Sequence, residues 1–354
     1  MQRRTLEAFL GDADLDAEMD EPNPPGDDLD NYEQFEALLT GQRPRRMKEN
    51  HKKKKTKWEI RALLEERPKL RDDGRQFFAP SLSVTSAERA WLEENLGPFR
   101  DGGLLASVLR KVKGGKEANV YCCAARRATG LKLIAAKVYR PRLFRSLRND
   151  TQYRQGRVLL GADGKPADIK RREARALEMH SRFGRELEHT SWLAYEFYTL
   201  ERLHTAGVAV PRPLKQSEHV ILMEYVGEET VPAPALSHVS LERDEAQPLF
   251  MQLLRDVETM LALDVIHGDF SAYNVLYWEG EVKIIDFPQV VSPDGNPDAR
   301  FIFGRDVERL CQYFAKYGVR ANPRRMAREL WDKHVKAKLQ ENADFTDETL
   351  MDAG

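Results

Sequence analysis

The hydrophobic and polar positions follow different patterns in two parts of the chain, and the difference predicts a sheet followed by helices. Short β-prone runs cover residues 104–113, 119–126, 132–139 and 219–225, with glycine or proline in most of the segments between them. Runs of this kind, bounded by turn residues, are typical of strands. We therefore expect a twisted antiparallel sheet in the first part of the folded region.

Helical patterns dominate the later part of the chain. Residues 243–263 place apolar side chains at the helical period of 3.6 residues. Further helices are expected over 192–203 and 299–317, and from residue 322 to about 352, where the end frays. Pro323 suits the start of that last helix. The order of strands and helices favours an α+β fold.

Another helix is expected just before the sheet. Thr85 and Glu88 have the spacing of a capping box, so a helix is predicted to begin there and to run to about Asn95. Gly97 and Pro98 are predicted to stop it. Folded structure is therefore expected to begin near Val84.

One stretch carries the side chains of a phosphoryl-transfer centre. Residues 266–286 contain Asp269, then Asn274 five positions later, and Asp286 at the end of an apolar run. In phosphoryl transfer one Asp lies near the attacking oxygen, while an Asn and a second Asp hold the metal that bridges the nucleotide phosphates. Two short strands with a Glu-Gly turn between them would fix Asn274 and Asp286 at the ends of a hairpin. The alternative interpretation is that all three are turn and cap residues.

A lysine and a glutamate fit the same chemistry. Lys137 shares one strand face with small and apolar residues, which is also compatible with a lysine that reaches out to water. Glu196 falls inside the apolar stripe of its helix, four residues from both Trp192 and Leu200, and a buried carboxylate needs a cation. We expect Lys137 to pair with Glu196 and the pair to orient nucleotide phosphates.

The connection between the first two strands is a candidate phosphate-binding loop. Gly114 and Gly115 let backbone amides approach an anion, and Lys113 and Lys116 add positive charge beside Glu117. The loop has neither the GxGxxG pattern nor Walker A spacing, so a plain hairpin turn is the alternative interpretation.

Charge is balanced overall but segregated near the N-terminus. The 354 residues carry a formal net charge of −1, yet residues 11–40 contain no Lys or Arg and residues 43–57 are strongly basic. We expect a disordered acidic arm. The basic stretch either contacts RNA or ribosomal phosphates, or is neutralised by the acidic arm.

Two further features concern location and partners. The chain has no apolar run long enough to span a membrane, its N-terminus lacks an apolar signal core, and its three cysteines do not form a disulfide or zinc pattern. We expect a cytoplasmic protein with no membrane partner. The arginine-rich segment 144–190 is a long insertion that either covers the cleft, binds a partner, or forms a solvated surface helix.

Several motifs, in order along the chain, resemble those of the RIO family of atypical protein kinases. They are GKEANVY at 115–121, AAKVY at 135–139, WLAYEFYTLERLHTAGVAVPRP at 192–213, PAP at 232–234, HGDFSAYN at 267–274 and IIDFPQ at 284–289. The resemblance covers residues 85–318. It implies a trimmed two-lobed protein-kinase-like fold, with an antiparallel β N-lobe carrying one main helix and a helical C-lobe. It also implies ATP with Mg²⁺ or Mn²⁺ as cofactors.

The resemblance implies roles for the residues of the phosphoryl-transfer centre. Asp269 would be the catalytic base, and Asn274 and Asp286 would be the metal ligands. Asp286 could also carry a phosphoaspartate. Lys137 and Glu196 would be the pair that orients the phosphates.

Two more elements of the site follow from the same resemblance. Residues 223–227 would be the hinge, where backbone groups of Glu224 and Val226 read the adenine edge. Asp306 is a candidate anchor for the amides of the catalytic loop, with an exposed helix charge as the alternative. Gly114 stands where Ser or Thr is usual, a departure that could weaken phosphate contacts.

The motifs do not all favour one subfamily. GKEANVY and PAP resemble the first RIO subfamily, whereas HGDF and IDFPQ are nearer the second. Because we see no winged-helix module before the kinase lobe, we favour the first. Family members act in maturation of the small ribosomal subunit, as kinases or as ATPases.

These expectations divide the chain into an N-terminal extension (1–83), an N-lobe (84–226), a C-lobe (227–341) and a tail (342–354). The predicted function is an ATP- and Mg²⁺-dependent serine/threonine-type protein kinase or ATPase that acts on a protein or on itself. One alternative is a small-molecule kinase of the aminoglycoside-phosphotransferase type, which the short chain after Asp286 disfavours. The other is a nucleotide-gated RNA-binding module with little turnover.

Overall fold

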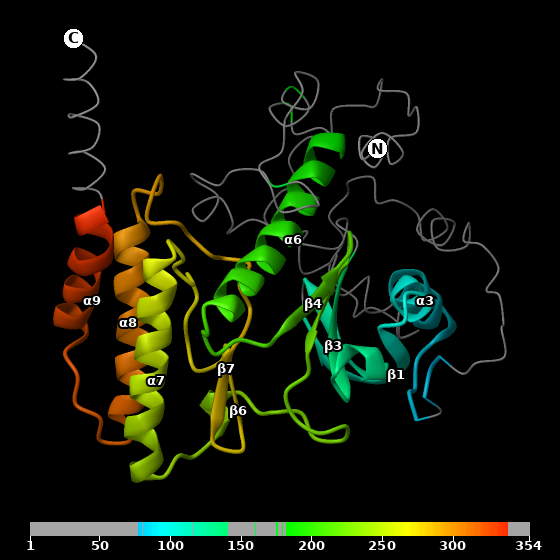
Figure 1. The fold of residues 1–354 in the computed structure, drawn as a ribbon, viewed down its shortest axis with the longest axis horizontal. Coiled ribbons are helices and arrows are strands. Elements are labelled where there is room, and N and C mark those ends of the chain that lie inside the picture. The colour runs from blue at the N-terminus through cyan, green and yellow to red at the C-terminus, as the bar shows by residue number, and fades with distance from the viewer. Residues whose placement is uncertain are drawn as a thin grey trace, which may run out of the picture.

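The computed structural model describes residues 77–79, 81–115, 117–140, 160, 175, 179 and 182–338. The acidic arm, the basic stretch 43–57, Lys116, most of the 144–190 insertion and the tail 342–354 lie outside the described residues, so what we predict for them stays a prediction. Within the described range a β-sheet lobe and a helical lobe lie side by side, and helix α6 runs between them (Figure 1).

Five strands form the sheet of the first lobe. They pair antiparallel in the order β1-β2-β3-β5-β4. Their bounds are Leu105–Gly114 for β1, Ala118–Ala125 for β2, Leu133–Tyr139 for β3, Pro213–Gln216 for β4 and Val220–Glu224 for β5. The four predicted strands are all present, with small differences at their ends. Lys137 lies on the central strand β3, opposite Val120 on one side and Ile221 on the other.

Helix α3 (Ser86–Asp101) packs beside this sheet, and it runs further than predicted. Thr85 caps its start, because the hydroxyl oxygen accepts the backbone N–H of Glu88 at 3.2 Å. The prediction that Gly97 and Pro98 stop the helix was wrong. Pro98 cannot donate a backbone hydrogen bond of its own, but the helix continues past it, and the Gly102 N–H donates to the Pro98 carbonyl at 2.9 Å.

Folded structure also begins before Val84. The side chains of Phe77 and Phe78 are buried, and Phe78 forms a parallel bridge with Val108 of β1. The Val108 N–H donates to the Phe77 carbonyl at 2.8 Å. The expected boundary followed from the helix start at Thr85, and it left out these two adjacent aromatic side chains, which bury a large apolar surface.

The second lobe consists mainly of helices around a small hairpin. Helices α7, α8 and α9 stand side by side, and the hairpin β6–β7 lies between them and the sheet (Figure 1). The bounds are Arg182–Thr205 for α6, Arg243–Ala262 for α7, Ala299–Ala315 for α8, Pro323–Trp331 for α9, Val275–Trp278 for β6 and Glu281–Ile284 for β7. A π-helical turn, Asp332–Lys336, follows α9. Short 3-10 turns occur at Arg127–Thr129 and Leu236–His238.

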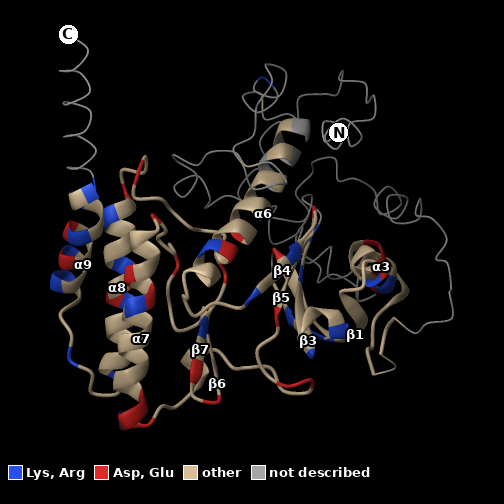
Figure 2. Cartoon of the chain, viewed as in Figure 1, with Lys and Arg blue, Asp and Glu red and all other residues tan. Residues whose placement is uncertain are grey.

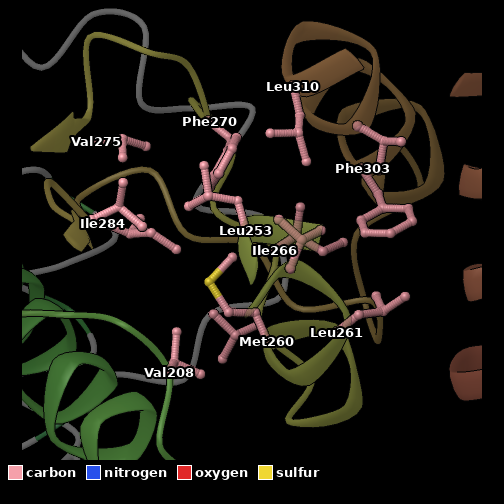
Figure 3. Close-up of a cluster of buried hydrophobic side chains, with 14 of the residues drawn as sticks. Val208, Leu253, Met260, Leu261, Ile266, Phe270, Val275, Ile284, Phe303 and Leu310 are labelled. Atoms are coloured by element: carbon pink, nitrogen blue, oxygen red, sulfur yellow. The ribbon is translucent and has the colours of Figure 1, made fainter. Parts of the chain in front are cut away.

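The largest hydrophobic core supports the hairpin and the loop that precedes it. Figure 3 shows Phe270, Val275 and Ile284 converging on side chains from α7 and α8, including Leu253 and Leu310. All five are buried. The segment that contains Asp269, Asn274 and Asp286 is therefore packed against apolar side chains of the core, which limits how far its polar side chains can move.

Charges of both signs are interspersed over α8 and α9 (Figure 2). None of the helices in the described ranges is long and apolar enough to cross a membrane. Cys122, Cys123 and Cys311 are buried free thiols.

Candidate active site

The loop from His267 to Asn274 is held by its backbone. Gly268 has a φ of 81°, a left-handed conformation that glycine adopts without a steric penalty. Its N–H donates to Asp306 Oδ2 at 2.8 Å, and the Phe270 N–H donates to Asp306 Oδ1 at 3.2 Å. The predicted anchoring of loop amides by Asp306 is thus present. Burial raises the pKa of the Asp306 carboxyl to about 7, against the lowering effect of these two amides.

His267 joins this loop to the end of β7. The ring is buried, with Nε2 at 3.1 Å from the Ile285 carbonyl oxygen and Nδ1 at 3.3 Å from the Asp269 amide nitrogen. A carbonyl oxygen only accepts and an amide N–H only donates, so the neutral tautomer with hydrogen on Nε2 satisfies both contacts. Burial lowers the pKa of His267, which agrees with a neutral structural ring.

The side chain of Asp269 has donors on both carboxylate oxygens. Arg309 Nη1, from α8, lies 2.8 Å from Oδ1, and Asn274 Nδ2 lies 3.2 Å from Oδ2. Asn274 Nδ2 also donates to the Asp269 carbonyl at 2.9 Å. The carboxylate is about half exposed, so it remains accessible to a second molecule.

The hairpin places Asn274 and Asp286 just outside its two ends, as expected. Val275 pairs with Ile284, and the Ile285 N–H donates to the Asn274 carbonyl at 2.9 Å. Asp286 follows with a φ of 72°. A non-glycine residue in this conformation is uncommon and often marks a functional site.

Lys137 connects the two lobes. Its Nζ lies 2.7 Å from Glu196 Oε1 and 2.8 Å from Asp286 Oδ1. The predicted pairing with Glu196 is therefore present, and Asp286 is an additional partner. The Tyr139 hydroxyl donates to Glu196 Oε2. Glu196 is buried on α6, in the apolar stripe where the sequence placed it.

Lys137, Glu196 and Asp286 form a charged triad in which each opposite charge favours the ionised form of the other. Burial by itself would lower the pKa of the Lys137 ammonium, but the carboxylates of Asp286 and Glu196 outweigh burial and raise that pKa well above its ordinary value. Loss of water contacts around the Asp286 carboxylate would raise its pKa, yet the Lys137 ammonium holds that pKa below its ordinary value, with a smaller contribution from Lys113. Both groups are therefore charged at neutral pH.

An apolar cluster lies on the same sheet face as Lys137. It combines buried and partly buried side chains of β1, β2, β3 and the segment after β5: Leu109, Val112, Val120, Cys122, Leu133, Ala135, Met223 and Tyr225. A flat apolar base could pack against such a surface. At the adjoining strand end the Glu224 N–H donates to the Arg212 carbonyl, and the Val226 carbonyl accepts from the Ala233 N–H. Neither bond uses the Glu224 carbonyl or the Val226 N–H, the two groups that we predict to read adenine.

The candidate phosphate loop is a tight turn between β1 and β2. Gly114 pairs with Asn119, and the Gly115 N–H donates to the Ala118 carbonyl at 2.9 Å. The Glu117 carbonyl accepts the Arg140 N–H at 2.9 Å. The described residues on either side of Lys116 pair as the two ends of a hairpin, and a role for Lys113, Lys116 and Glu117 in phosphate binding stays a prediction.

Oxygen atoms suited to a divalent cation are present at the ends of the hairpin. Because Asn274 Nδ2 is turned to Asp269, its amide oxygen is left for a ligand, and Asp286 offers a carboxylate. Mg²⁺ prefers oxygen ligands and typically takes one or two from the protein, completing its shell with water and phosphate oxygens. In the described part of the chain, no group of three or more His, Cys, Asp or Glu could hold a metal ion by itself. The oxygens of Asn274 and Asp286 fit a cation that takes its other ligands from water and nucleotide phosphates.

Sequence reasoning missed two arginines of the site. Arg309 contacts the Asp269 side chain, and Arg305 Nη2 donates to the Gly268 carbonyl. Both lie on α8 with Asp306. Arg305 and Arg309 lie one and three residues from Asp306, so the three side chains are near the same face of the helix. This spacing was the sequence signal that could have placed both arginines at the site.

The sheet lobe, the helical lobe and the triad between them define a protein of the protein-kinase-like class. Comparison with known sequences makes this more specific. A family model described as the RIO domain matches residues 165–326. This match covers just under half of the chain and, with the relatives below, supports a RIO-family atypical protein kinase.

Relatives from several branches of this family are similar to the chain. Serine/threonine-protein kinase RIO1 of Caenorhabditis elegans is 28% identical over 243 residues, which cover 66% of this chain and 44% of that protein. Serine/threonine-protein kinase rio2 of Schizosaccharomyces pombe is 32% identical over 214 residues, 59% of this chain and 52% of the relative. RIO-type serine/threonine-protein kinase Rio2 of Methanocaldococcus jannaschii is 35% identical over 138 residues, 37% and 50% respectively.

The aligned regions span about half the length of these relatives, or less. RIO1, RIO2 and RIO3 proteins all match. The matches therefore leave the subfamily unresolved, and our preference for the first stays a prediction.

Proposed function

We propose that this protein transfers the γ-phosphoryl group of ATP, with Mg²⁺ or Mn²⁺, to a protein hydroxyl or to water. The observation that carries the proposal is the Lys137 triad. One ammonium from the sheet lobe contacts a buried glutamate on α6 and Asp286 beside the hairpin, at 2.7 and 2.8 Å. In this arrangement the Lys137 ammonium is available to the nucleotide phosphates and lies next to the oxygens that would hold the metal.

In this proposal the residues of the chain have separate tasks. Lys137, fixed by Glu196, binds phosphate oxygens. Asn274 and Asp286 would hold the cation, which supplies positive charge to the phosphate groups when it is bound. Asp269 orients the acceptor and accepts its proton. The apolar cluster and the hinge backbone bind the adenine ring of ATP.

The central test uses purified protein with Mg²⁺ and γ-labelled ATP, and follows protein-bound label and free phosphate. The variants are Asp269→Asn and Asp286→Asn, because asparagine tolerates the positive φ at 286 better than alanine does. Asp294→Asn, at an exposed loop carboxylate, is the matched control. We expect wild type and control to turn over, and both site variants to lose roughly 10²-fold or more of the rate.

The fate of the label distinguishes the outputs. Label that hydroxylamine removes would indicate a phosphoaspartate, and label that resists hydroxylamine would indicate phosphoserine or phosphothreonine. A wild type that binds ATP but turns over no faster than the variants contradicts the proposal and favours a nucleotide-gated binding module. Transfer to an aminoglycoside or similar small alcohol, with no protein acceptor, favours the small-molecule kinase.

A finer proposal concerns the target. The basic stretch 43–57 would bring the chain to RNA of a small ribosomal subunit particle in the cytoplasm, where ATP state would govern attachment. Replacing Lys52, Lys53, Lys54 and Lys55 by Ser should weaken RNA binding and flatten its dependence on salt. Unchanged affinity and salt slope would mean that the acidic arm neutralises this stretch instead.

A further inference from the structure

The Asp269 carboxylate is half exposed but is not left to rotate freely. An exposed aspartate normally samples several side-chain rotamers. Here Arg309 Nη1 holds Oδ1 at 2.8 Å while Asn274 Nδ2 lies 3.2 Å from Oδ2. The two donors approach from different elements, α8 and the end of the catalytic loop. Together they select one orientation of the carboxylate.

Helix α8 is a rigid source for the Arg309 contact. Its other side is buried in the large core through Ile302 and Leu310. The same helix supports the backbone next to Asp269, through Arg305 on the Gly268 carbonyl and Asp306 on two amides. Arg309 extends this support from the backbone of the loop to the side chain that would meet the acceptor.

The loop brings no cation of its own to this position. The residues between Asp269 and Asn274 are Phe, Ser, Ala and Tyr. Within the described part of the chain, the one ion pair recorded for Asp269 is with Arg309. The charge beside the acceptor carboxylate is therefore supplied across a separation of 40 positions in sequence.

We propose that Arg309 is a positioning residue for phosphoryl transfer, which fixes the Asp269 carboxylate in the orientation that receives the acceptor hydroxyl. The inference rests on the proposed function. Arg309 acts through Asp269 on the chemical step, so its removal should lower kcat and leave the KM for ATP nearly unchanged.

Two alternative roles make different predictions. A purely structural role is disfavoured because exposed ion pairs contribute little to folding, and both side chains are more than one third exposed. An inhibitory role would require Arg309 to block the base. Each carboxylate oxygen can accept more than one hydrogen bond, so the contact leaves Asp269 able to accept a proton.

The test compares Arg309→Met with Arg309→Lys in the full chain, measuring kcat, KM for ATP and thermal unfolding. Methionine keeps length and helix propensity but removes the charge. Because Arg309 contacts Asp269 through a single nitrogen–oxygen pair, lysine can replace it. Arg325→Met, which removes an exposed α9 ion pair to Glu329 at 3.6 Å, is the matched control.

We expect kcat to fall about tenfold or more in Arg309→Met, since small misplacements of a reacting group have effects of this size or larger. Arg309→Lys should recover most of the loss, and Arg325→Met should match wild type. In an Asp269→Asn background, Arg309→Met should have no further effect, because residues that act as a unit are not additive.

Each contrary result has its own meaning. Wild-type kcat in Arg309→Met, with Asp269→Asn still inactive, overturns the inference and leaves the proposed function standing. A raised kcat overturns it in favour of inhibition. Equal losses of kcat in the Met and Lys variants, or a loss of folding stability that accounts for the lost rate, overturn it in favour of a structural role. A wild type without turnover overturns both proposals.

Discussion

Replacing Lys137 by methionine should destabilise the protein because it leaves two carboxylates without their shared cation. Lys137 Nζ contacts Glu196 at 2.7 Å and Asp286 at 2.8 Å. The Glu196 side chain is only 5% exposed, so water cannot replace the lost ammonium there. Removing one partner of a buried pair costs about 3–5 kcal/mol. The lower end applies, since Asp286 is half exposed and Tyr139 still donates to Glu196.

A loss of about 3 kcal/mol would lower the midpoint of thermal unfolding by roughly 6–12 °C for a domain of this size. The matched control is Lys333→Met. Lys333 also contacts a glutamate at 2.7 Å, but its side chain is 65% exposed and His334 shares the same Glu258. An exposed pair contributes about 0–1 kcal/mol, so the control should shift the midpoint little.

Two further measurements test whether the lost stability comes from the unpaired carboxylates or from a general disturbance of the fold. Adding Glu196→Gln to Lys137→Met should recover part of the stability, since it removes one uncompensated charge. Lys137 also holds the pKa of Asp286 below its ordinary value, a contribution that is present above the unfolded pKa and lost as the pH falls through the folded one. The gap between wild type and Lys137→Met should therefore narrow below about pH 4. Equal midpoint shifts for Lys137→Met and Lys333→Met would refute the burial argument.

Three other predictions follow from the structure. Gly227→Ala should lower the free energy of unfolding, measured in urea, by roughly 2 kcal/mol or more, because φ is 117° and the new Cβ would lie 2.6 Å from both Val231 O and Ala233 N. Gly318→Ala is the control: its φ is 87°, but the new Cβ would meet no atom, so the cost should be only about 1 kcal/mol. Burial raises the pKa of Asp306 to about 7 from 3.8, so between these pH values the folded protein holds a proton that the unfolded chain releases. As the pH rises from 4 to 7, the free energy of unfolding of wild type should therefore fall by up to about 4 kcal/mol relative to that of Asp306→Asn. Parallel curves of this free energy against pH for the two proteins would contradict the prediction. Thr85→Ala should cost about 1 kcal/mol by removing the α3 cap, and an unchanged urea midpoint would show that the cap contributes nothing.

The elements of the fold could be predicted where one local signal dominated. Four of the five sheet strands and the hairpin beside Asp286 are short β-prone runs between turn residues, and the structure has them where expected, whereas β4 was not predicted at Pro213–Gln216. The prediction was wrong at the end of α3. Gly97 and Pro98 are strong stop signals locally, but Leu96 and Phe99 are buried against the sheet and extend the helix past them. Tertiary packing here outweighs propensity.

The site could be predicted where a buried charge had to have a partner. Glu196 in an apolar stripe required a cation, and Lys137 was a suitable one in sequence and in structure. No such requirement pointed to Arg309, because an arginine on a helix surface satisfies its charge in water. Its spacing from Asp306 places it near the same helix face, but its contact with Asp269 depends on how α8 packs against the catalytic loop, which that spacing does not determine.

The charges around the hairpin explain why a cation and a nucleotide would bind here together. Lys137 contributes one positive charge against the two negative charges of Glu196 and Asp286, so this triad carries a net negative charge, while Asp269 is balanced by Arg309. A nucleotide alone would bring phosphates next to Asp286 and be repelled. A cation bound by Asp286 and the Asn274 amide oxygen would remove that repulsion and release Lys137 toward the phosphates. Nucleotide affinity should therefore depend on Mg²⁺ in wild type and much less in Asp286→Asn, where the repelling charge is absent.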